Sequence, residues 1–184
     1  MITAQDYLYT QPSGQGCLAV CLAYLCGNEP NRDYEQYMVS QGVFVDRDNY
    51  VLGMVYAFRA FCETDRVSLY IGFERPRYTR YLLQQNKYQN LGIKHCDAYE
   101  LLQVDTIPRP YIVYLDRHGL GAYYHYPHFV LVLKHTPQTY LIFDPWDGKT
   151  RRHDRTKVIQ AVRLLDEHLR VCPVIIWRSS YTKM

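Results

Sequence analysis

The amino-acid sequence predicts an α+β protein, with N-terminal helices packed on a C-terminal antiparallel sheet. Segments with helical spacing or all-round apolar character dominate up to about residue 105. From about residue 106, apolar runs rich in β-branched and aromatic residues alternate with short turns. Helices followed by strands are typical of α+β folds. The 184 residues hold no repeat or low-complexity linker, so we expect one domain over residues 1–184.

The first predicted helix is the most apolar stretch in the N-terminal part. It follows a loop, residues 11–16, that is rich in Pro and Gly. Residues 17–26 (CLAVCLAYLC) are apolar on every side, and Gly27 follows them. A helix without a polar face is buried, and a glycine typically ends it. Cys17 is therefore expected in the first turn of a core helix.

Hydrophobic periodicity, together with the positions of glycine, proline and capping residues, predicts the remaining elements. Residues 31–41 predict a helix that Asn31 caps and Gly42 stops. Other helices are expected at residues 51–62, 78–85, 98–103 and 157–167, and strands at residues 67–71, 111–115, 127–134, 139–144 and 173–177.

Charge and cysteine usage exclude several classes of function. The 21 basic and 18 acidic residues give a net charge of +3, which is too balanced to predict nucleic-acid or membrane-surface binding. No apolar run reaches the ~20 residues of a membrane span, and no secretory signal is recognised at the start. The protein is therefore expected to be cytoplasmic, with its six cysteines reduced. No CxxC pair occurs, so no metal or other cofactor is expected.

Two features of the composition can be explained by ordinary surface structure or by function. Tyrosine occurs 19 times, which suits half-buried surfaces in general and also a groove that grips a peptide. Basic residues cluster at Lys149, Arg151, Arg152 and Arg155, and we interpret them as solvated surface.

Cys17 is the candidate nucleophile. A thiol attacks a carbonyl as the thiolate, which the N-terminus of a helix and a nearby imidazolium both favour. The glycines of the preceding loop allow a substrate to approach closely. The alternative is that Cys17 is a small buried apolar residue, as Cys21, Cys26 and Cys62 are expected to be.

His128 is the candidate base among seven histidines, because it begins the most hydrophobic predicted strand. The strands at 127–134 and 139–144 form a hairpin, so the start of one lies beside the end of the next. Asp144 then lies next to His128 and orients one ring nitrogen, leaving the other for Cys17. The alternative for Asp144 is a turn-forming role before Pro145, with Asp147 as the next candidate.

An oxyanion needs hydrogen-bond donors. The backbone N–H of Cys17 provides one, and the side-chain amide of Gln11 or of Gln15 qualifies as the second.

These motifs together resemble a known family. Gln11–x5–Cys17 before an apolar helix, then RPYIVYL, HFVLVLKH and YLIFDPWDGK, are similar to the leader-peptidase domains of bacteriocin-exporting ABC transporters and their stand-alone relatives. The resemblance covers residues 11–25 and 107–149, and this chain has Gly-Cys-Leu where the family often has Asp-Cys-Gly. It implies a papain-like cysteine proteinase fold, with Gln11 in the oxyanion hole and Cys17, His128 and Asp144 as the triad.

Three functions remain open from the sequence. The first is a thiol-dependent peptidase that cleaves a peptide or peptide-like substrate through a thioester. The second is an acyl- or aminoacyl-transferase that resolves the same thioester with an amine. The third is an inactive relative that only binds a peptide. No oligomeric state is predicted.

Overall fold

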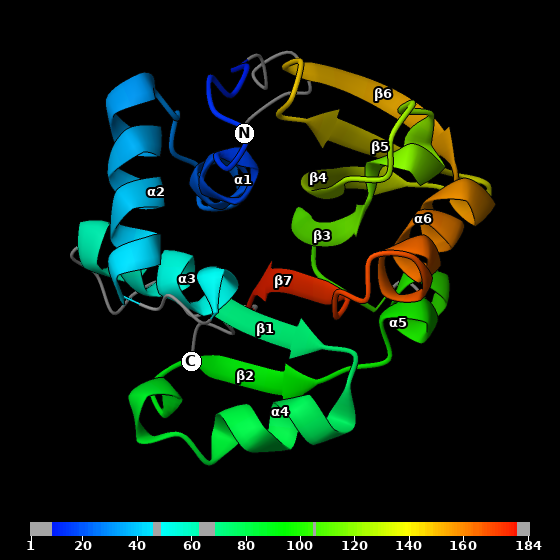
Figure 1. Cartoon of the computed structure of the whole chain (residues 1–184). Coiled ribbons are helices and arrows are strands. Elements are labelled where there is room, and N and C mark those ends of the chain that lie inside the picture. The colour runs from blue at the N-terminus through cyan, green and yellow to red at the C-terminus, as the bar shows by residue number, and fades with distance from the viewer. Residues whose placement is uncertain (1–8, 46–48, 63–68, 105, 180–184) are drawn as a thin grey trace, which may run out of the picture.

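The computed structural model of the protein describes residues 9–45, 49–62, 69–104 and 106–179. Six α-helices and seven strands make up the described fold (Figure 1). The helices are α1 (Cys17–Leu25), α2 (Arg32–Val45), α3 (Tyr50–Phe61), α4 (Pro76–Leu83), α5 (Ala98–Val104) and α6 (Arg155–Glu167). The strands are β1 (Leu69–Phe73), β2 (Gly92–His95), β3 (Tyr111–Asp116), β4 (Pro127–His135), β5 (Thr139–Asp144), β6 (Lys149–Asp154) and β7 (Val174–Arg178). Two short 3₁₀ helices are η2 (Asn86–Tyr88) and η3 (Arg117–Leu120).

The seven strands form one mostly antiparallel sheet in the order β2-β1-β7-β3-β4-β5-β6. Only the pair β1 and β2 is parallel. The hairpin of β4 and β5 contains a bulge between Val132 and Lys134. The predicted α+β class, with N-terminal helices and an antiparallel sheet, is therefore confirmed at this level.

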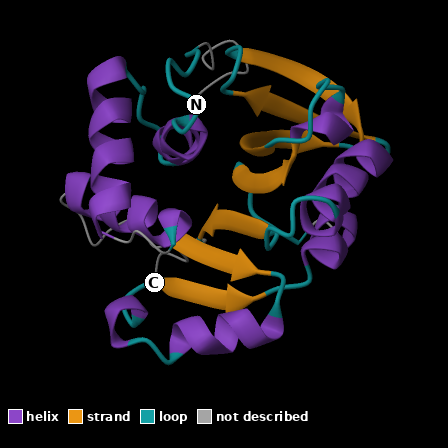
Figure 2. Ribbon diagram, in the orientation of Figure 1, coloured by secondary structure: helices purple, strands orange, loops and turns teal. Residues whose placement is uncertain are grey.

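Helices cover both faces of the sheet (Figure 2). Neighbouring strand residues belong to two separate cores: Ile112 and Leu131 pack with α1 to α3, whereas Val113 and Val130 pack with α5 and α6. This alternation explains why β3, β4 and β5 read as continuous apolar runs instead of alternating ones.

Helix α1 lies inside the molecule, between α2 and α3 on one side and β3 and β4 on the other (Figure 1). All nine of its residues are buried, which agrees with its lack of a polar face. The backbone carbonyl of Ala19 accepts a hydrogen bond from the Tyr34 hydroxyl of α2 at 3.0 Å. This bond fixes the first turn of α1, which carries Cys17, against α2.

Helix α2 corrects the prediction that Gly42 ends the second helix, because the helix continues to Val45. A Cβ atom on Gly42 would lie 3.2 Å from the Met54 Cα atom of α3. The glycine therefore allows two helices to approach closely instead of terminating one.

Two strands, β2 and β6, were not predicted. They are the two edges of the sheet, and their sequences, GIKH and KTRRHD, lack apolar alternation. Charged residues are typical of edge strands, so Lys149, Arg151 and Arg152 of the basic run are at once surface residues and strand residues, whereas Arg155 begins α6. Because β1 and β2 come early in the chain, the expected division into a helical part to about 105 and a sheet part from about 106 is only approximate.

Other predicted boundaries move by a few residues. Helix α4 begins at Pro76, a residue suited to the first helical turn. Helix α6 begins at Arg155, because the Asp154 side chain caps it. Residues 67 and 68 of the predicted strand 67–71 lie outside the described residues. Within the described residues, no helix combines the length and the apolar character needed to cross a membrane.

The burial of α1 leads to a stability prediction. Leu22 is 0% exposed in the core, whereas Leu83 at the end of α4 is 54% exposed. Leu22→Ala should lower the free energy of unfolding by about 2–5 kcal/mol through lost burial and a cavity, measured by urea denaturation. The matched control, Leu83→Ala, should change it by less than about 0.5 kcal/mol. Equal effects of the two substitutions would contradict the placement of α1.

Candidate active site

Cys17 is the first residue of α1, and Gly16 is its N-cap. It is 5% exposed, so the thiol lies at the boundary of the core. Cys21, one turn later, is fully buried with its Sγ 3.7 Å from the Phe129 carbonyl, and burial raises the pKa of its thiol well above the ordinary value. Both cysteines belong to the same core, and Cys17 lies at its edge.

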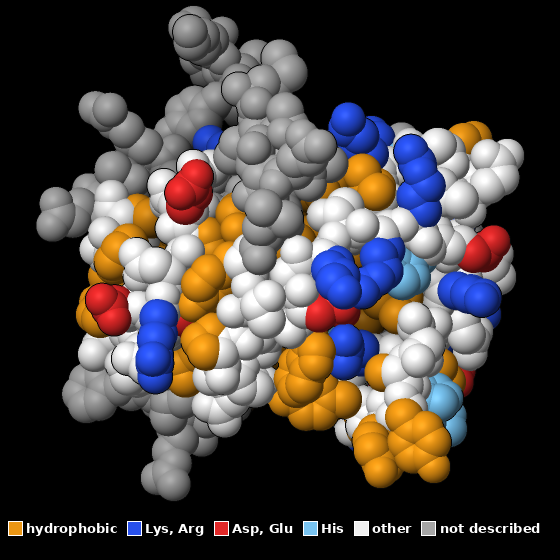
Figure 3. Space-filling model, turned by 90° about the horizontal axis from the view of Figure 1, so that it is seen from above, with side chains coloured by type: hydrophobic (Ala, Val, Ile, Leu, Met, Phe, Trp, Pro, Cys, Tyr) orange, Lys and Arg blue, Asp and Glu red, His pale blue; other side chains and the backbone are white. Residues whose placement is uncertain are grey.

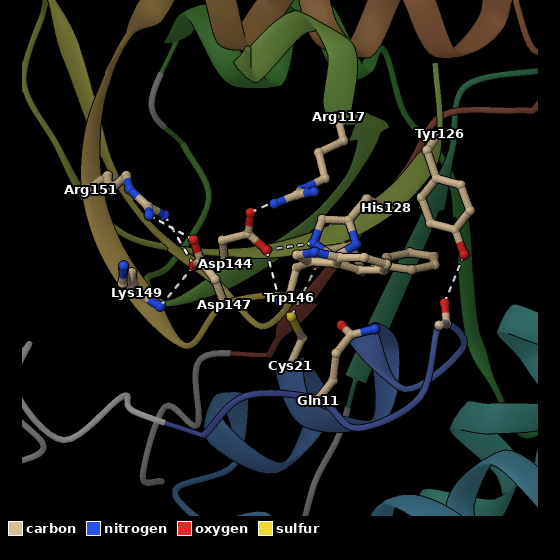
Figure 4. A network of polar contacts seen from close by, with 12 residues as sticks. Gln11, Cys21, Arg117, Tyr126, His128, Asp144, Trp146, Asp147, Lys149 and Arg151 are labelled. Atoms are coloured by element: carbon tan, nitrogen blue, oxygen red, sulfur yellow. Dashed lines mark hydrogen bonds and ion pairs between the residues drawn. The ribbon is translucent and has the colours of Figure 1, made fainter. Parts of the chain in front are cut away.

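His128 and Asp144 meet as the hairpin topology predicted (Figure 4). His128 Nε2 lies 2.7 Å from Asp144 Oδ1, and the imidazole is 0% exposed. Asp144 is the last residue of β5 and also accepts the backbone N–H of Trp146 at 2.9 Å. The turn that follows β5 therefore holds the carboxylate against the ring.

The electrostatics of the pair favour an imidazolium beside a carboxylate. Burial disfavours the charge on His128, but hydrogen bonding to Asp144 and the proximity of Cys17 outweigh it and raise the pKa of His128 to about 9. Burial likewise opposes ionisation of Asp144, yet His128, the Trp146 N–H and Arg117 lower the pKa of its carboxyl to about 2. Both groups are thus charged over the neutral pH range.

The second nitrogen of His128 is left for the sulfur. Nδ1 is buried without a hydrogen bond of ordinary geometry, which is rare for a buried polar atom, and hydrogen bonding to the Cys17 side chain is among the causes that raise the pKa of the ring. Because Asp144 occupies Nε2, Nδ1 is the nitrogen available to Cys17, whose nearness raises the pKa of the ring. The structure therefore brings Cys17, His128 and Asp144 together in that order.

Two residues around Asp144 escaped sequence reasoning. The Arg117 Nε donates to Asp144 Oδ2 at 3.3 Å. Its guanidinium lies 5.0 Å from the ring centroid of Trp146, which meets the His128 ring edge to face at 6.3 Å. Trp146 thus partly covers the His128–Asp144 pair (Figure 4). A tryptophan directly after Asp-Pro was a usable signal, whereas nothing near Arg117 in the sequence marked it.

Gln11 and Gln15, the two candidate oxyanion donors, lie in different surroundings. Gln11 is buried, and its backbone N–H donates to the Pro145 carbonyl at 2.8 Å, which ties it to the turn after Asp144. One side-chain N–H of Gln11 is directed to the Ser13 carbonyl, and its Oε1 is buried without a partner. The side chain of Gln15 is exposed.

Glu35 of α2 supports the loop before the nucleophile, and sequence reasoning missed it. It is 1% exposed and accepts hydrogen bonds from the Ser13 N–H at 3.2 Å, the Ser13 hydroxyl at 2.7 Å and the Tyr9 hydroxyl at 3.1 Å. A Cβ atom on Gly16 would lie 1.8 Å from its carboxylate. Gly16 is therefore required for Cys17 to begin its helix directly beside this charge.

The other acid and base candidates are engaged elsewhere. Asp147 holds Arg151 with contacts of 3.1 and 2.6 Å (Figure 4). His125 pairs with the buried Asp116, and His135 stacks on Tyr140. In the described part of the chain, no group of three or more His, Cys, Asp or Glu side chains is arranged to hold a metal ion.

A hollow of about 310 Å³ opens on the α3 side of the sheet, and we call it the aromatic hollow. Most of its lining is aromatic or apolar, including Tyr50, Phe73, Tyr78 and Tyr114. Burial raises the pKa of both Tyr50 and Tyr114. The Tyr50 hydroxyl donates to the backbone carbonyl of Gln15, so this wall of the hollow lies near the loop that precedes Cys17. Its size falls within the range of ordinary ligand pockets.

No protein-family model and no curated protein matches the sequence.

The His128–Asp144–Cys17 arrangement predicts a measurable titration. The His128 ring should lose its proton near pH 9, as followed by NMR of the imidazole nitrogens. Removing the carboxylate charge in Asp144→Asn should lower that pKa by at least about one pH unit, and Cys17→Ala should also lower it. Asp147→Asn serves as the control, because Asp147 binds Arg151, and should leave the titration unchanged. An unaltered pKa in Asp144→Asn would refute the pairing.

Proposed function

We propose that the protein is a thiol-dependent peptidase of papain-like architecture, with Cys17 as nucleophile, His128 as acid and base and Asp144 as the orienting residue. One observation carries the proposal. The buried His128 ring makes a 2.7 Å hydrogen bond from Nε2 to Asp144, its Nδ1 has no other partner of ordinary geometry, and the nearby Cys17 raises the pKa of the ring. A merely structural histidine has no need of an orphan nitrogen beside a thiol.

In the first step, the Cys17 thiolate attacks the carbonyl carbon of the substrate and the carbonyl electrons move to its oxygen. The tetrahedral intermediate then collapses: the C–N bond breaks, and the His128 imidazolium gives its proton to the leaving amine. The products are the released amine and a thioester on Cys17. Asp144 stabilises the imidazolium before transfer and keeps the ring oriented throughout.

In the second step, His128 takes a proton from water while the water oxygen attacks the thioester carbon. The C–S bond breaks, the carboxylic acid leaves, and the proton stays on His128, which restores the starting thiolate–imidazolium pair. An amine in place of water would give acyl transfer by the same path, which keeps the transferase as the alternative.

The oxyanion requires donors close to Cys17. The backbone N–H of Cys17 stands at the start of α1, where N–H groups have no intrahelical partner. Burial and attachment to Pro145 favour Gln11 over the exposed Gln15 as the side-chain donor. One N–H of the Gln11 amide is used by Ser13, which leaves the second for the oxyanion.

The papain-like assignment is supported by the position of each group. The proposed nucleophile begins a buried helix, and the base and orienting residue come from an antiparallel hairpin packed on that helix. The resemblance to bacteriocin leader peptidases rests on the same residues, Gln11, Cys17, His128 and Asp144. It makes a peptide the favoured substrate class.

Alkylation tests the activated thiol without any substrate. Iodoacetamide at mildly acidic pH should label Cys17 in preference to the five other cysteines, because burial raises the pKa of each of those thiols. Peptide mapping by mass spectrometry gives the site. His128→Ala should lower the rate at Cys17 by about tenfold or more. Slow labelling that is uniform over all six thiols would favour a protein that only binds peptides.

Turnover can be read from a pooled library of synthetic peptides digested by the protein and sequenced by mass spectrometry. Cys17→Ala should reduce cleavage to background, a loss of about 10⁴-fold or more. His128→Ala should lose at least as much as Asp144→Ala, for which about 10²- to 10⁴-fold is expected. Cys26→Ala, at the far end of α1, is the control and should retain activity. Full activity in Asp144→Ala would remove Asp144 from the site, and added hydroxylamine would reveal acyl transfer as hydroxamate products.

A further inference from the structure

A second cavity lies on the opposite side of the sheet from the aromatic hollow. It measures about 410 Å³ and is lined by η3 and the glycine that follows it, by the end of β6 and by the start of α6. A smaller cavity of about 170 Å³ reaches Arg117 and Asp144. Both cavities share Leu120, Gly121 and His153, so together they form one trough that begins at the outer side of Asp144. Four basic and three acidic side chains line it, and we call it the basic trough.

The charges along this basic trough are unevenly paired. Near Asp144, the two arginines are matched: Arg117 contacts Asp144, and Arg151 contacts Asp147. Farther along, Arg152 and Lys157 line the larger cavity and form no ion pair with any side chain that the structure describes. The outer part of the trough therefore presents cations that are free to meet an anion.

The remaining polar groups of the trough do not cancel this charge. The Asp154 carboxylate is directed to the start of α6, where it accepts the backbone N–H groups of Thr156 and Lys157 at 2.8 and 3.3 Å. His153 is partly buried, and burial followed by the charges of Arg151 and Lys157 lowers its pKa. Lys and Arg side chains gather around a histidine on the face seen in Figure 3.

The proposed reaction predicts which half of the substrate lies in the basic trough. His128 must reach the leaving amine, so the half of the substrate that departs lies on the imidazole side of the Cys17 sulfur. Asp144 and Arg117 stand on the far side of that imidazole, and the trough continues from them. The acyl half of the substrate then lies toward the aromatic hollow between α3, β1 and β7.

We propose that the basic trough binds an acidic segment of the substrate, located on the C-terminal side of the cleaved bond. This inference rests on the peptidase function proposed above. The aromatic hollow and the basic trough then select opposite halves of one peptide: apolar residues before the cleaved bond and Asp or Glu residues after it. Arg152 and Lys157 are the specificity-determining residues, and they take no part in bond cleavage.

Binding tests the basic trough without catalysis. The probe is fluorescein-labelled hexaglutamate, and anisotropy is measured with the folded Cys17→Ala protein at low salt. Hexaglutamate should bind more tightly than hexaglutamine and should weaken as salt is added. The pair Arg152→Gln with Lys157→Gln should reduce affinity at least about fivefold. A matched pair on other surfaces, Arg77→Gln with Lys134→Gln, removes the same net charge from exposed sites and should change it less than about twofold.

Cleavage gives the second readout. In the peptide library, Asp and Glu should be enriched after the cleaved bond, and the Arg152/Lys157 pair of substitutions should abolish that enrichment while neutral peptides are still cleaved. The preference should appear mainly in KM, since the trough lies away from the reacting atoms.

The outcomes separate the two proposals. Equal losses in both charge-removing pairs, or equal binding of hexaglutamate and hexaglutamine, would overturn the acidic-peptide site even if peptides are cleaved. Displacement of hexaglutamate by an equal concentration of inorganic phosphate would also overturn it, because the trough would then be a site for a small anion. Absence of any cleavage would refute the proposed peptidase function, while the anisotropy measurement would still test whether the basic trough binds an acidic peptide.

Discussion

Helix α1 has no polar face, so it must be covered on every side, and this constraint decides where the proposed nucleophile lies. The sheet strands β3 and β4 cover one side, and α2 and α3 cover the others. Cys21 inside the helix contacts the backbone of β4, which brings the first turn of α1 alongside the first residues of that strand. Cys17 and His128 are thus neighbours because of hydrophobic burial, with no need for a direct bond between them to hold the elements together.

The polar groups of the site lie next to this apolar core and are paired with one another. His128 carries a buried imidazole that a carboxylate stabilises, and Asp144 is held in turn by Arg117 and by the Trp146 backbone. Charged groups that are buried this deeply are costly unless they are paired. A second pair joins His125, in the loop before β4, to Asp116 at the end of β3, and its histidine contacts other histidines. A His–Asp pair alone therefore does not mark a site, and the unpartnered Nδ1 beside a thiol is what distinguishes His128.

Two contacts hold the loop before Cys17: one with Glu35 of α2 and one with the turn after β5. Glu35 binds Ser13, and the Gln11 N–H binds Pro145. These contacts join the segment that carries the proposed oxyanion donors to the segment that carries Asp144. The cavities on the two sides of the sheet differ in character: the one toward α3 is mostly aromatic and apolar, and the one toward β6 and α6 carries Arg152 and Lys157.

The sequence alone determined the features that depend on local pattern. An all-apolar run of helical length and a glycine after it predicted α1 with Cys17 in its first turn, and two apolar runs joined by a short turn predicted the hairpin that unites His128 and Asp144. Only the tertiary structure decided the rest, because those features depend on contacts between distant segments. Gly42 allows close helix packing, β6 is a strand only because β5 lies beside it, and Glu35, Arg117 and the basic trough acquire their roles from residues far away in the chain. Periodicity reports which face of an element is buried, but it carries no information about which charge will meet which partner across the fold.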